Sequence, residues 1–145
     1  MVQYRNIIVA IDGSDHAKAA LKKAISVASR NTATLNIVNV IDTRSWANLE
    51  AHNAEKLQKD SEVFSQSLID SYNEAELAGI ENINIIVETG SPRTLITHEI
   101  SRRVNADLIV CGASGMNAAE KILLGSVSEN IVRTAECDVL VVRGN

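Results

Sequence analysis

Short runs of β-branched and other apolar residues alternate with longer amphipathic segments along this chain, and this alternation restricts the folds available to it. A near-continuous apolar run is typical of a strand covered on both faces of its sheet. Five such runs predict strands at Asn6–Ile11, Thr34–Val40, Ile83–Glu88, Leu108–Gly112 and Asp138–Val142. Because a helical segment separates each strand from the next, we expect an open α/β fold with a parallel sheet, right-handed crossovers and helices on both faces.

The first two intervening segments have the pattern of helices. In Ser14–Arg30 the apolar residues fall on one face at helical spacing, namely Ala17, Ala20, Leu21, Ala24, Ile25 and Ala28. A longer helix is expected from about Ala47 to Ala78, because this segment is rich in Glu, Gln, Ala and Leu. Gly79 suits the left-handed position past its end.

Two further helices are predicted in the second half of the chain. One has Ser91 at its N-cap and Pro92 at its first helical position. Its inward residues are expected at steps of four: Ile96, Ile100 and Val104. The fourth helix begins at Ser126.

Composition restricts the class of protein. A length of 145 residues with 46% apolar content predicts one domain over residues 1–145. The net charge of −4 and the lack of a basic cluster beside aromatic residues disfavour nucleic acid as a partner. The apolar run that Asp12 closes is too short to span a membrane and lacks the features of a signal peptide, so we expect a cytoplasmic protein with no membrane partner.

The two cysteines, Cys111 and Cys137, have neither metal-binding nor redox-motif spacing and are expected to be buried thiols. Cys111 closes the fourth strand and Cys137 opens the fifth. With a rise of ~3.3 Å per residue, they should lie near opposite ends of the sheet. A disulfide needs Cα atoms within about 7 Å, so none is expected within one subunit.

A binding crevice is expected where the strand order reverses, beyond the carboxyl ends of the strands. The first strand ends in "DGSD", which contains Asp12, and the fourth ends in "GASG", which contains Gly112. If these two strands are neighbours, an acidic side chain and a glycine-rich loop meet at one crevice.

The glycine-rich loop reads "GASGMNAAEKILLGS" and has two interpretations. Gly112 and Gly115 could expose backbone N–H groups to a phosphate, while Gly125 and Ser126 lead into a helix N-terminus that also favours anions. Alternatively, the glycines are ordinary loop residues, and Ser126 with Glu129 forms a capping box that needs no ligand. Local chemistry alone leaves both interpretations open.

Asp12 also has two interpretations. A carboxylate before a helix often serves as a cap or turn residue. Since no basic residue lies near it in the sequence, Asp12 otherwise suits ribose hydroxyls or a phosphate-bound metal better than phosphate itself.

The segment "GASGMNAAEKILLGSVSENI" resembles the G-x2-G-x9-G-[S/T] signature of the ATP-binding branch of the universal stress protein family. The signature positions are occupied by Gly112, Gly115, Gly125 and Ser126. The resemblance implies a Rossmann-like domain with strand order 3-2-1-4-5, usually a homodimer, that holds ATP. It also implies that Asp12 faces the ribose and phosphates, that the backbone of Val40 borders adenine, and that the signature residues surround the phosphates.

The loop departs from this family in its charge. Family members often carry a histidine or basic residue there, whereas this chain has Ser114 and Met116 and leaves Lys121 as the loop's cation. We expect ATP as the ligand, or else ADP or AMP, together with a Mg²⁺ ion that contacts the protein only indirectly near Asp12.

The last strand, Asp138–Val142, contains neither an interior lysine nor a proline, so as a sheet edge it favours pairing with a second copy. The alternative is that Arg143–Asn145 covers this edge in a monomer. Three residues are few for that purpose, so a homodimer is expected.

Three functions remain compatible with the sequence. The favoured one is a nucleotide-binding regulatory module with at most slow ATP hydrolysis, because the chain has no G-x4-G-K-[S/T] loop and we assign no catalytic residue. His16 is expected to be a solvated helix residue, and His52 and His98 have no assigned chemistry. The alternatives are an enzyme of the adenine-nucleotide α-hydrolase group and a nucleotide-free interaction protein of the same fold.

Overall fold

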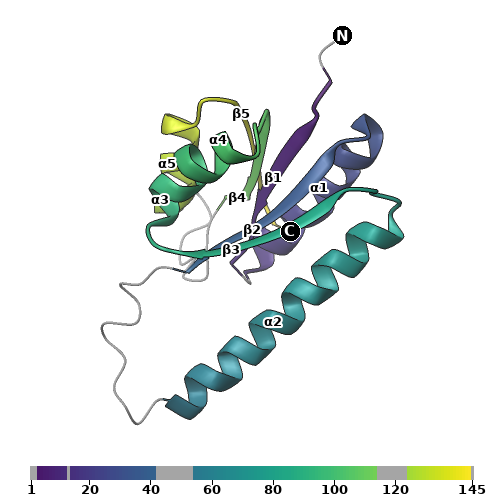
Figure 1. The fold of residues 1–145 in the computed structure, drawn as a ribbon. Helices are drawn as coiled ribbons and strands as arrows, with labels where there is room; N and C mark the ends of the chain where they lie inside the picture. The colour runs from purple at the N-terminus through teal and green to yellow at the C-terminus, as the bar shows by residue number, and fades with distance from the viewer. Residues whose placement is uncertain (1–2, 13, 42–53, 114–123, 145) are drawn as a thin grey trace.

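The computed structural model describes residues 3–12, 14–41, 54–113 and 124–144, with residues 54–64 described as backbone alone. Its sheet has five parallel strands in the order β3-β2-β1-β4-β5, which confirms the predicted α/β fold and strand order (Figure 1). The strands are β1 Asn6–Ala10, β2 Thr34–Ile41, β3 Ile83–Thr89, β4 Leu108–Gly112 and β5 Asp138–Val142. The predicted strands agree with these bounds to within one residue at each end.

Each face of the sheet packs against its own set of helices. On one face, alternate strand residues such as Ile7, Val9 and Ile37 form a core with α1 (Asp15–Asn31) and α2 (Ala54–Leu77). On the other face, Ile8 and Val38 pack with the helical segment that follows β3 and with α5 (Ser126–Thr134). Burial on both faces explains why the central strands have near-continuous apolar sequences.

Helix α1 forms as the sequence predicts. The six apolar residues assigned to its inward face are all buried. The hydroxyl of Ser14 accepts the amide of Ala17 at 3.1 Å and caps the helix N-terminus. Thr32 ends the helix in the left-handed region, with φ of 53°.

Helix α2 ends at Leu77, and Gly79 follows in the left-handed region with φ of +90°. The amide of Gly79 donates to the carbonyl of Glu76, and the amide of Ile80 donates to that of Ala75. This pair of bonds is a Schellman motif, so the predicted role of Gly79 is confirmed. Of the predicted helix, residues 47–53 lie outside the described residues.

The helical segment after β3 differs from the prediction of one regular α-helix. It consists of α3 (Pro92–Thr94), a π-helical stretch η3 (Leu95–Ile100) and α4 (Ser101–Arg103). Thr97 is buried and donates its hydroxyl to the carbonyl of Arg93 at 2.7 Å, a type of bond that competes with the regular helical ladder. Pro92 holds the predicted first helical position, and Ser91 holds the N-cap without a side-chain bond.

The expected inward residues of this segment still pack on the core. Ile96 and Ile100 are buried, while Val104 is partly buried and follows the last helical turn. The prediction of a continuous α-helix was therefore wrong in the geometry of its central turn but right about which side faces the sheet.

The cysteines are free thiols at opposite ends of the sheet, as predicted. Cys111 pairs in register with Val141, whereas Cys137 precedes the first residue of β5. Burial raises the pKa of the Cys111 thiol to about 11, and it also raises the pKa of Cys137, which is less buried.

We therefore expect iodoacetamide at pH 8 to alkylate both native cysteines slowly, with Cys137 ahead of Cys111. Mass spectrometry of timed samples measures the order, and protein unfolded in urea provides the fast reference. Faster labelling of Cys111, or an internal disulfide, would contradict the strand register.

Candidate functional site

The carboxyl edge of the sheet, where the strands end, brings the two predicted halves of the site together. β1 and β4 are neighbours, with Val9 in register with Val110, so the assumption about their adjacency is confirmed. Beyond the end of β1, Ile11 donates its amide to the carbonyl of Val38 at 2.9 Å. The buried side-chain amide (Nδ2) of Asn39 donates to the carbonyl of Ile11 at 2.8 Å, which ties the start of the β1–α1 turn to β2.

Asp12 lies at this edge in an exposed position. Its Oδ1 accepts the amide of Ser14 at 2.9 Å, which is the bond of a turn residue. The interpretation of Asp12 as a turn residue is thus correct for one carboxylate oxygen. For Oδ2 the described part of the chain records no partner, so this oxygen can accept a hydroxyl donor.

Gly112 is buried where the first turn of α1 crosses the end of β4. A Cβ on this residue would lie 2.8 Å from both the carbonyl carbon and the Cβ of His16. The fold therefore requires glycine here for the close approach of a helix to a strand, whatever the residue does toward a ligand. The prediction of a solvated His16 was wrong, because this side chain is half-buried and also packs against Gly144.

Hydrogen bonds join the two ends of the glycine-rich loop. The amide of Gly125 donates to the carbonyl of Ala113 at 2.8 Å, and the amide of Ala113 donates to the carbonyl of Val142 at 2.8 Å. The buried hydroxyl of Ser128 donates to the carbonyl of Gly112. The first turn of α5 is consequently fixed against the end of β4, and the amide of Gly125 is already used in this closure.

The N-terminus of α5 has no side-chain cap. Gly125 is the N-cap, so Ser126 is the first helical residue rather than the cap, and the capping-box interpretation is wrong. Glu129 instead forms an ion pair with Arg133 at 2.6 Å. The amides of the first three helical residues, Ser126 to Ser128, have no recorded bond within the described residues, in contrast to the capped start of α1.

Val40 lies near the end of β2, half-buried, and is paired in register with Glu88. Its side chain packs on the same face of the sheet as α5. Gly115 lies outside the described residues, as do Ser114, Met116 and Lys121, so these predictions are not tested by the structure.

Metal chemistry at this edge would depend on few protein ligands. Within the described ranges, no three His, Cys, Asp or Glu residues are grouped as a metal site. Asp12 alone suits a Mg²⁺ ion whose other ligands are phosphate oxygens and water.

Among the residues that the structure describes, no helix is long and apolar enough to cross a membrane.

Comparison with known proteins identifies the family. A model of the universal stress protein family matches residues 3–143, which is nearly the whole described chain. The chain belongs to the universal stress protein family. The match identifies the family as a whole and does not separate its ATP-binding branch from its other members.

Relatives of this universal stress protein cover its full length. A Staphylococcus epidermidis protein that carries the family name is 49% identical over 144 residues, covering 99% of this chain and 86% of that relative. The solved structure of universal stress protein UspA from Lactobacillus plantarum is 27% identical, with a TM-score of 0.85, and the match covers 99% of this chain and 100% of that one. A universal stress protein solved in complex with cAMP is 28% identical, with a TM-score of 0.71 and 98% coverage of both chains.

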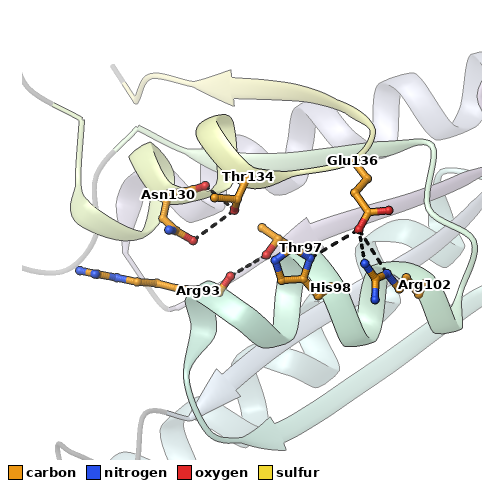
Figure 2. Close-up of polar contacts among 7 residues, drawn as sticks. All are labelled: Arg93, Thr97, His98, Arg102, Asn130, Thr134 and Glu136. Atoms are coloured by element: carbon orange, nitrogen blue, oxygen red, sulfur yellow. Dashed lines mark hydrogen bonds and ion pairs between the residues drawn. The ribbon is translucent and has the colours of Figure 1, made fainter.

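This universal stress protein also has a polar cluster that the sequence did not reveal (Figure 2). It lies beside the start of β5, and therefore at the opposite edge of the sheet from Asp12. Arg102 on α4 pairs with Glu136 at 2.6 Å, and this hydrogen bond holds the pKa of the Glu136 carboxyl below its usual range. Nδ1 of His98 lies 3.6 Å from the same oxygen. The cluster links the helical segment after β3 to the connection that leads into β5.

Ser128 is the site residue that sequence reasoning missed. A serine three residues into a helix has no distinctive spacing, and its bond to Gly112 spans 16 positions of the chain. The available signal was the small polar residue on the otherwise apolar inward face of α5, which includes the buried Ile131. A buried hydroxyl at such a position requires a partner, and the carbonyl at the end of β4 provides it.

Proposed function

We propose that this universal stress protein is a regulatory module that binds an adenine nucleotide (ATP, or ADP or AMP) at the carboxyl edge between β1 and β4. The proposal covers one nucleotide-binding domain over residues 1–145. The observation that carries it is the hydrogen bond from Gly125 to Ala113, which places the uncapped start of α5 beside the end of β4. Free helix amides and the positive end of the helix dipole favour a phosphate at this position.

The remaining roles follow from position along this edge. The free oxygen of Asp12 would accept the ribose hydroxyls, and the backbone of Val40 would border adenine. Gly115 and Ser126 would contribute to the phosphate site, together with the amides of the first turn of α5. Gly112 and Gly125 would act mainly by shaping it, since a Cβ on Gly112 would overlap His16 and the amide of Gly125 binds Ala113.

Binding is better supported than catalysis. Efficient ATP hydrolysis needs a group that orients water and cations that stabilise the transferring phosphoryl group. Of the described residues at this edge, Asp12 is engaged in a turn and His16 packs against two glycine positions. At most slow hydrolysis is proposed, and the α-hydrolase and nucleotide-free alternatives remain the outcomes to test against.

The test is to purify the protein without added ligand, denature it and separate the supernatant by chromatography. Adenine nucleotide should be released. For protein that is free of nucleotide, ATP at 100 times its Kd should raise Tm by roughly 8 °C. Nucleotide-free protein with no shift at millimolar ATP would support the interaction-protein alternative, and steady formation of AMP from ATP and a second substrate would support the enzyme.

We also propose that the protein is a homodimer paired through β5. This strand is a sheet edge, and Val139 to Val142 are all half-exposed. Val142 directs its carbonyl to the β4 side, where it binds Ala113. Because the N–H and C=O groups of alternate residues point to opposite sides, those of Val141 face outward.

Val141→Pro therefore removes an outward donor while it preserves the bonds between β4 and β5. Size-exclusion chromatography with light scattering should give a dimer for the wild type and a monomer for this variant. A folded Val141→Pro dimer, or a monomeric wild type, would contradict pairing through β5.

A further inference from the structure

Arg93 differs from the other arginines on the helices of its sheet face. Arg102, Arg103 and Arg133 each form an ion pair with a glutamate at 2.6 Å. The guanidinium of Arg93 is exposed, and the described residues provide it with no hydrogen bond or ion pair. No acidic residue lies in the first turn of its helix either. Its charge is thus left without a counter-ion from the part of the chain that the structure describes.

The position of Arg93 relates it to the proposed nucleotide site. Arg93 belongs to α3, which contacts α5. The turn before α3 is fixed to the end of β2, because Gly90 donates its amide to the carbonyl of Ile41 at 2.9 Å. Ile41 follows Val40, the residue assigned to the adenine side. Arg93 therefore lies at the carboxyl edge, on the same sheet face as the nucleotide-bordering residues.

The side chain of Arg93 extends toward the start of α5. Figure 2 shows the guanidinium extended away from the cluster of His98, Arg102 and Glu136 and past Asn130, on the side where α5 begins. The helical segment that begins with α3 and helix α5 both run antiparallel to the strands, so both begin at the carboxyl edge of the sheet. A cation in the first turn of one helix beside the uncapped start of another creates a positive potential that an anion would stabilise.

We propose that Arg93 binds the terminal phosphoryl groups of the nucleotide, so that the preferred ligand is an adenosine di- or triphosphate rather than a monophosphate. This inference rests on the proposed nucleotide site. The amides at the start of α5 provide donors for one phosphate, and the long arginine side chain provides a second, separate set of donors. Its planar guanidinium can bind two oxygens of a phosphate at once. Other family members often carry a histidine or basic residue in the glycine-rich loop, where this chain has Ser114 and Met116. Arg93 thereby supplies a cation in place of that residue.

The experiment measures the Kd values of ATP, ADP, AMP and cAMP by calorimetry for the nucleotide-free wild type, Arg93→Ala and Arg93→Lys. Loss of a charged hydrogen-bonding partner should weaken ATP binding by about tenfold in Arg93→Ala. AMP and cAMP should change by less than about twofold, since neither has a β- or γ-phosphate. Arg93→Lys should recover part of the ATP affinity because it keeps the charge.

Arg30→Ala is the matched control, because it removes the same charge from an exposed position in the last turn of α1, at the opposite edge of the sheet. It should leave all four affinities unchanged. Equal weakening of ATP and AMP in Arg93→Ala, or no weakening of ATP, would overturn the assignment while the nucleotide site itself stands. A wild type that binds none of the four ligands would instead overturn the proposed function. Circular dichroism verifies that each variant is folded.

Discussion

Gly112→Ala should destabilise the protein by about 2 to 3 kcal/mol, in the upper part of the range of about 1 to 3 kcal/mol that overpacking typically costs. The added Cβ would lie 2.8 Å from the carbonyl carbon of His16 and 3.0 Å from its carbonyl oxygen. These are main-chain atoms of α1, so they cannot move without shifting the helix from the sheet. Urea unfolding measures the change in the free energy of unfolding.

Gly144→Ala is the matched control, since its added Cβ would approach the same residue. In this case the nearest atom, at 2.6 Å, belongs to the imidazole ring of His16, so the contact is with a side chain and not with the main chain of α1. We expect a cost below about 1 kcal/mol, in the range of a surface substitution. Equal losses in the two variants would show that the contact of Gly112 with the α1 backbone is not what makes glycine necessary.

Ser128→Ala should destabilise the protein by about 2 kcal/mol, because it leaves a buried carbonyl without its donor. The hydroxyl of Ser128 donates to the carbonyl of Gly112, the last residue of β4. Its loss removes a side-chain link between the first turn of α5 and β4. Hydrogen exchange of the α5 amides should therefore increase more than that of the α1 amides, and nucleotide binding should weaken with it.

Two variants separate this link from a general effect of serine removal. Ser128→Thr keeps the hydroxyl and should recover most of the lost stability. Ser126→Ala removes an exposed hydroxyl from the same turn and should change stability by less than about 0.5 kcal/mol. If Ser128→Ala has the same midpoint of urea unfolding as the wild type, the hydroxyl of Ser128 does not hold α5 in place.

Most of the fold could be predicted because the relevant signals are local and repeated. The strands have apolar runs with clear ends, and α1 has an inward face of six residues that the structure buries without exception. Gly79 and Pro92 mark helix ends through their own backbone preferences. The order of the strands was not local information and came from the resemblance to the family.

The geometry of the candidate site was harder to predict because it depends on contacts between distant segments. Ser126 and Glu129 match a capping box, but Gly125 takes the N-cap position and Glu129 pairs with Arg133. The π-helical turn at Leu95–Ile100 has no periodic signal, since apolar spacing in that segment fits an ordinary helix equally well. Ser128 and Arg93 acquire their roles only through the helices that pack beside them.

The contact between Gly112 and α1 affects how the family signature is interpreted in other members. A relative that has lost its ligand but keeps the same crossing of helix and strand would still need the first glycine of the signature. That glycine is consequently a marker of architecture, and its presence in a sequence is weak evidence of ligand binding. A cation that aligns with Arg93, considered together with an uncapped start of the last helix, would be a more selective marker of members that hold a polyphosphate.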